Sequence, residues 1–83
     1  MSGPVFEAKW DDGIVTRMSV FCTTAEPDLS RAVRLSWHAH DSRTKGRNPT
    51  AKIVSAQFEY NGAVLETYKT IDPDKHHKRK KKT

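Results

Sequence analysis

The residues best suited to chemistry in this chain are cations at its C-terminal end. Residues 73–83 hold six of the 15 Lys and Arg residues and one of the ten Asp and Glu residues, so their net charge of +5 equals that of the whole chain. Basic side chains that neutralise phosphates release counterions, and the resulting binding to nucleic acid is independent of sequence and sensitive to salt. The alternative is a tail that only keeps the protein soluble. The predicted phosphate contacts are Lys75, Lys78, Arg79, Lys80, Lys81 and Lys82.

A second basic cluster lies in residues 42–49, where Arg43, Lys45 and Arg47 occur without an acidic residue. The cluster falls at a predicted helix end, where cations complement the helix dipole and polar residues form turns. Its functional interpretation is a loop that contacts phosphates together with the tail.

Histidine and cysteine, the other reactive residues, do not form a site. His38 and His40 are two residues apart, so on a helix they point in different directions and cannot hold one metal ion. The adjacent His76 and His77 make an incomplete site. Cys22, the single cysteine, is predicted to be a small buried hydrophobic residue. The sequence therefore predicts no catalytic residue, metal, cofactor or small-molecule substrate, and a binding module rather than an enzyme.

The length and composition suggest one small soluble domain. No run approaches the roughly 20 apolar residues of a membrane span, and a lone cysteine is typical of a reducing compartment. We therefore expect a cytoplasmic protein with a single α+β domain over residues 1–71 and a disordered Lys/Arg-rich tail over residues 72–83.

The first expected hairpin joins Val5–Trp10 to Ile14–Cys22 through a three-residue loop with Gly13 in the left-handed conformation. Alternation then pairs Ala8 with Thr16 and gives the hairpin one apolar face. The members of that face are Phe6, Ala8, Trp10, Ile14, Thr16, Met18, Val20 and Cys22, and Phe6 pairs with Met18.

Asn61-Gly62 predicts a second hairpin with a two-residue type I′ turn. The pairs that follow from this turn are Tyr60 with Ala63, Phe58 with Leu65 and Ala56 with Thr67. Val54 belongs to the same apolar face.

A helix is expected from about Leu29 to about Lys45, with Asp28 as its N-cap. Trp37 and His40 lie on its apolar stripe, and Trp37 is predicted to anchor the core. These elements give a ββαββ two-layer sandwich, with one helix on a four-stranded, mostly antiparallel sheet. Strands two and three could lie parallel, or the hairpins could meet through other edges in a wholly antiparallel sheet.

The sheet face away from the helix mixes cationic, aromatic and aliphatic residues. Its expected members are Lys9, Val15, Arg17, Phe21, Ile53, Val64 and Tyr68. The candidate contacts are Lys9, Arg17, Phe21 and Tyr68. Such a face could stack bases, bind a protein or a second copy, or be ordinary surface. The leading hypothesis is non-specific nucleic-acid binding through the tail, and the alternative is an adaptor or homodimer that uses the sheet face or edge.

Overall fold

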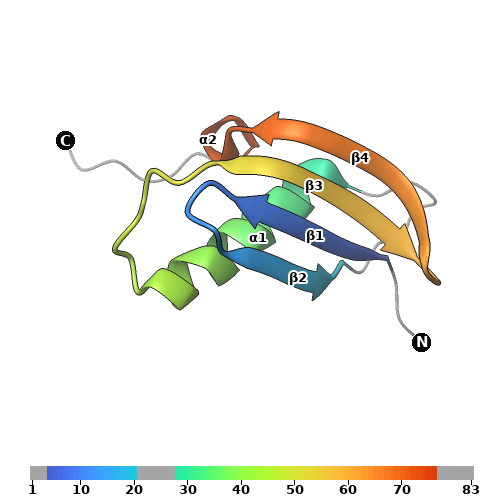
Figure 1. Cartoon of the computed structure of the whole chain (residues 1–83), viewed down its shortest axis with the longest axis horizontal. Helices are drawn as coiled ribbons and strands as arrows, with labels where there is room; N and C mark the ends of the chain where they lie inside the picture. The colour runs from blue at the N-terminus through green and yellow to red at the C-terminus, as the bar shows by residue number, and fades with distance from the viewer. Residues whose placement is uncertain (1–3, 21–27, 77–83) are drawn as a thin grey trace.

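The computed structural model describes residues 4–20 and 28–76 and shows one four-stranded sheet with one main helix on one face (Figure 1). The strands are β1 (Val5–Trp10), β2 (Val15–Ser19), β3 (Ile53–Tyr60) and β4 (Ala63–Ile71), and the helices are α1 (Leu29–Thr44) and α2 (Pro73–His76). The sheet order is β2-β1-β3-β4, and all neighbours are antiparallel. The predicted α+β sandwich is confirmed, and its two hairpins meet through β1 and β3.

The first hairpin has the predicted register. Gly13 adopts a φ of +91°, a conformation that costs glycine little because it has no Cβ. Phe6 lies opposite Met18, and Ala8 lies opposite Thr16. Alternate β1 side chains are therefore buried, as the period-two pattern predicts.

The second hairpin begins as predicted. Asn61 and Gly62 have φ values of +53° and +82°, which fit a type I′ turn. Tyr60 lies opposite Ala63. The turn therefore follows directly from the local sequence.

A β-bulge between Phe58 and Glu59 makes the remaining predicted pairs wrong. The observed pairs are Phe58 with Glu66 and Ala56 with Tyr68, in place of Phe58 with Leu65 and Ala56 with Thr67. An extra residue in one strand reverses the faces of all residues beyond it. Tyr68 consequently lies on the helix side of the sheet, where its ring packs edge-on to Phe58 with centroids 6.0 Å apart.

A second irregularity exchanges the predicted faces of Ile53 and Val54. Consecutive β1 residues Lys9 and Trp10 lie opposite Ser55 and Ile53, so Val54 is the extra residue. Ile53 is fully buried and Val54 is 48% exposed. The prediction that Val54 faces the helix and Ile53 faces away is wrong, because periodicity alone does not reveal a bulge.

Helix α1 starts and ends close to its predicted limits. Asp28 is the N-cap, and its side chain accepts a hydrogen bond from the Arg31 backbone N–H at 3.1 Å. Lys45, in the left-handed conformation with φ of 56°, is the C-cap. His40 is buried and His38 is exposed, as the helical periodicity predicts.

The core lies between α1 and the sheet, and its largest buried side chains are those of Phe6, Trp10 and Phe58. Trp37 is only partly buried and packs against this core from α1. Beyond β4, α2 packs against α1, and Pro73 is fully buried. Helix α2 occupies the first residues of the predicted tail, which was expected to begin at residue 72, and residues 77–83 lie outside the described part of the chain.

Candidate nucleic-acid interface

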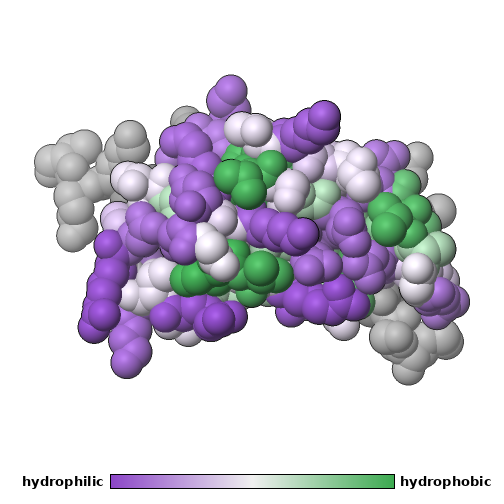
Figure 2. All heavy atoms as spheres, in the orientation of Figure 1, coloured by the Kyte–Doolittle hydropathy of each residue, from purple (hydrophilic) through white to green (hydrophobic). Residues whose placement is uncertain are grey.

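The sheet face turned away from α1 carries three rows of side chains that run across the strands. The first row is Val15, Lys9, Ser55 and Lys69; the second is Arg17, Glu7, Gln57 and Thr67; the third is Ser19, Val5, Glu59 and Val64. Figure 2 shows this face as mainly hydrophilic, with apolar side chains in small separate patches. A face without one continuous apolar patch suits a polar ligand better than a hydrophobic partner.

An ion-pair network occupies the middle of this face. Arg17 contacts Glu7 at 3.2 Å and Glu59 at 3.3 Å. The hydrogen bond to Glu59 raises the pKa of Arg17, and the same bond, with one from Gln57, lowers the pKa of Glu59. Arg17 therefore lies on the predicted face, but its charge is shared between two carboxylates.

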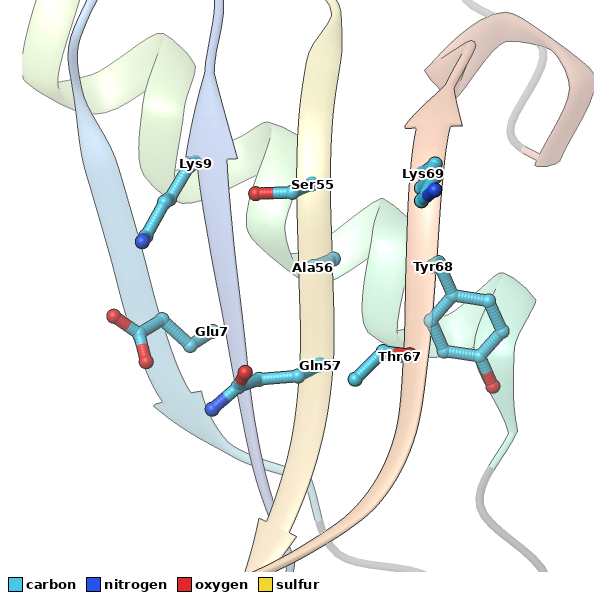
Figure 3. Close-up of a pocket in the computed structure, with 8 residues that line it drawn as sticks. All are labelled: Glu7, Lys9, Ser55, Ala56, Gln57, Thr67, Tyr68 and Lys69. Atoms are coloured by element: carbon cyan, nitrogen blue, oxygen red, sulfur yellow. The ribbon is translucent and has the colours of Figure 1, made fainter.

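Lys9 and Lys69 are cations of a different kind, because neither forms an ion pair with any residue in 4–20 or 28–76. Both lie directly opposite Ser55, one on each side. Between them is an open depression of about 290 Å³ (Figure 3). Its lining residues are Glu7, Lys9, Ser55, Ala56, Gln57, Thr67, Tyr68 and Lys69. We call this depression the sheet cleft.

Aromatic side chains do not contribute a stacking platform to the described part of this face. The predicted contact Tyr68 points away from the centre of the cleft in Figure 3, and its ring packs on Phe58 instead. Burial raises the pKa of Tyr68, and the nearby charge of Glu66 adds to this effect. Phe21, the other predicted aromatic contact, lies outside the described residues.

The antiparallel topology brings basic residues from distant segments to one end of the molecule. Lys9 is the last β1 residue on the helix-free face, and Lys69 lies near the end of β4. The Lys52 carbonyl accepts a hydrogen bond from the Asp11 N–H at 2.9 Å, and Arg43 donates to the Val15 carbonyl at 3.4 Å. The end of α1 thus lies beside the loops of the sheet (Figure 1).

The predicted contacts Lys45, Arg47 and Lys75 also lie in segments at this end of the molecule (Figure 1). Lys45 and Arg47 are exposed just beyond α1, and Lys75 is exposed in α2. Aspartates in the same turn and helix ends offset part of this positive charge, and they are Asp11, Asp12, Asp41, Asp72 and Asp74. Asp12 is hydrogen-bonded to His40, and Asp72 accepts a hydrogen bond from the Asp74 N–H. The predicted tail residues Lys78, Arg79, Lys80, Lys81 and Lys82 lie outside the described residues.

A His–Asp pair that the sequence did not reveal lies inside the fold. His40 Nε2 is 2.7 Å from Asp12 Oδ2, and the Asn48 amide donates to the same oxygen at 2.9 Å. The His40 side chain is only 2% exposed, and its ring stacks on Trp10. A ligand therefore has no access to this imidazole, and the pair holds the fold together. The signal for it in the sequence was a helical histidine on the packed face combined with an Asp-rich turn.

Within residues 4–20 and 28–76, no cluster of three or more metal-binding side chains occurs, and no helix has the length and apolar character needed to cross a bilayer. Cys22 lies outside these residues. No family model matches the chain, and comparisons with curated proteins and with solved structures gave no match.

Proposed function

We propose that the protein binds nucleic-acid phosphates without reading base sequence, through the basic tail and the cationic end of the sheet. The observation that supports this proposal is the gathering of basic residues from several segments at one end of the fold. Lys9, Lys52 and Lys69 approach that end from separate strands or loops. Several cations on one side attract a polyanion and orient it before contact.

The charge pattern favours phosphates as the ligand groups over bases. Lysine acts as a hydrated point charge suited to phosphate. The described part of the helix-free face carries no aromatic side chain for base stacking, since Tyr68 packs on Phe58. Binding should therefore depend on salt and differ little between base sequences.

The test uses labelled DNA duplex and single strand, with affinity measured by fluorescence anisotropy over a salt series. Replacing the five basic residues of 78–82 with Gln should remove most affinity and make the remaining affinity less dependent on salt. On duplex DNA, the slope of log affinity against log salt concentration changes by about 0.9 for each phosphate that the protein no longer neutralises. Equal affinity and slope with the neutral tail would contradict the proposal.

A matched pair of variants tests the cationic end of the fold. Lys45→Gln/Arg47→Gln should weaken binding, because both side chains are exposed beside the sheet loops. Arg31→Gln/Arg34→Gln removes the same charge from exposed positions in the first half of α1. That control should have the smaller effect. If both variants reduce the affinity equally, net charge decides binding and position does not.

An interaction with another protein is the second candidate, favoured by the exposure of β4. Residues 63–67, 69 and 70 of this edge strand are all exposed, and an unpaired edge can accept another strand. A bulge at Leu65 and the left-handed conformation of Thr70 interrupt that edge, which reduces its value as a template. If the protein binds another protein and that complex persists at high salt, the result would favour this candidate over nucleic-acid binding.

A further inference from the structure

The sheet cleft has the charge distribution of a site for one anion. Lys9 and Lys69 flank Ser55 on adjacent strands. Two strand spacings separate their Cα atoms by about 10 Å, a gap that two flexible lysine side chains can close around a small group between them. Both ammonium groups lack a carboxylate partner among the described residues.

The floor of the cleft supplies neutral hydrogen-bond donors. The Ser55 and Thr67 side chains point to the cleft side of the sheet in Figure 3. Neither hydroxyl forms a hydrogen bond with another residue of the described parts of the chain. The Gln57 amide is different, because it donates to Glu59. Two hydroxyl donors therefore remain for a ligand.

Glu7 is the single acidic residue that lines the cleft, and its carboxylate is held by Arg17 at 3.2 Å. This ion pair reduces its repulsion toward an anion, although it does not abolish it. The two lysines together carry twice the charge of Glu7, so the cleft keeps a net positive charge. Removal of the Glu7 charge should therefore strengthen anion binding.

We propose that the sheet cleft binds a single phosphate group, with Lys9 and Lys69 on either side and the Ser55 hydroxyl donating from below. A phosphate carries up to two negative charges and several strong acceptor oxygens. Two ammonium groups and two hydroxyl groups match that chemistry better than they match a carboxylate. The site goes beyond the proposed function, because it binds one phosphate group whether or not a polymer carries it.

The test is an NMR titration of the full chain with inorganic phosphate, at constant pH and ionic strength. The amides of Lys9, Ser55 and Lys69 should shift together with one dissociation constant. Shifts confined to the tail or to residues 43–47 would overturn the site.

Charge-matched variants make the test specific. Lys9→Gln should weaken phosphate binding about five-fold, the size expected for one exposed charged contact, and Ser55→Ala should weaken it as well. Arg34→Gln removes the same charge from an exposed α1 residue outside the cleft lining, so it should leave binding nearly unchanged. Glu7→Gln should increase the affinity. Equal weakening by Lys9→Gln and Arg34→Gln would show that the overall positive charge of the protein, and not this site, binds phosphate.

A second titration, with a short single-stranded oligonucleotide, identifies the source of the phosphate. Shifts of the cleft amides with both probes indicate backbone phosphodiesters. Shifts with inorganic phosphate alone indicate a small phosphorylated ligand, and the site then stands even if nucleic-acid binding fails. If neither probe shifts these amides, the site is wrong, whatever the tail binds.

Discussion

Nε2 of His40 lies 2.7 Å from Oδ2 of Asp12, which joins α1 to the β1–β2 turn between residues 28 positions apart in the sequence. The His40 ring also stacks on Trp10 with centroids 4.2 Å apart. Asn48 donates to the same Asp12 oxygen. One carboxylate thus connects the first hairpin, the helix and the loop that leads to β3, so the cationic end of the fold depends on it.

The first prediction concerns this carboxylate. Asp12→Ala should lower the free energy of unfolding by about 2–3 kcal/mol, because it leaves a buried imidazole without its partner. Urea denaturation measures the change. Asp11→Ala is the control, since the neighbouring Asp11 is exposed in the same turn. Equal stability of the two variants would contradict the role given to Asp12.

The second prediction concerns acid stability. Burial opposes ionisation of Asp12, but hydrogen bonds from His40, the Ile14 N–H and Asn48 outweigh it and lower its pKa below 3.8. The folded state therefore binds this proton less readily than the unfolded state. The contribution of the Asp12 carboxylate to stability should be complete above pH 3.8 and should disappear as the pH falls through the lowered pKa of Asp12. Across this range, the free energy of unfolding should change less with pH in Asp12→Asn than in Asp11→Asn.

The third prediction compares the two tryptophans. Trp10 is 2% exposed, and its Nε1 donates to Thr16 at 3.0 Å. Trp10→Ala should cost about 3–5 kcal/mol of unfolding free energy. Trp37→Ala should cost less, about 1–3 kcal/mol, because that ring is only partly buried. The reverse order in thermal denaturation would identify Trp37 as the main anchor, as periodicity alone suggests.

The fourth prediction tests where the folded domain ends. A chain truncated after Ile71 lacks Pro73, which is fully buried, and should melt at a lower temperature than the full chain. A chain truncated after His76 keeps α2 and should melt close to the full chain. If truncation after Ile71 leaves the melting temperature unchanged, α2 contributes nothing to stability and the domain ends at residue 71.

The fifth prediction concerns strain in β4. Thr70 has a φ of +49°, a conformation that a β-branched residue adopts at a cost. Thr70→Gly should raise the free energy of unfolding by about 0.5–1 kcal/mol. Thr67→Gly, at another exposed position of the strand, should lower it by about 1 kcal/mol. Denaturant unfolding that shows a decrease in both variants would indicate that Thr70 is unstrained.

Features encoded by neighbouring residues were predictable from the sequence. Asn61-Gly62 determines a type I′ turn, and Asp28 determines the start of α1. Alternation in β1 and helical spacing in α1 identified the buried residues of these two elements. These patterns act over a few residues, so local chemistry is sufficient to specify them. The excess of cations over acids in residues 73–83 was likewise visible in the composition.

The tertiary structure decided the features that depend on pairing between distant segments. The bulges at Val54 and beside Leu65 placed Ile53 in the core and Tyr68 on the helix side. A bulge depends on how two strands fit against a shared core, so a period-two pattern does not reveal it. The same is true of the sheet cleft, because Lys9 and Lys69 become neighbours of Ser55 only when β3 lies between β1 and β4.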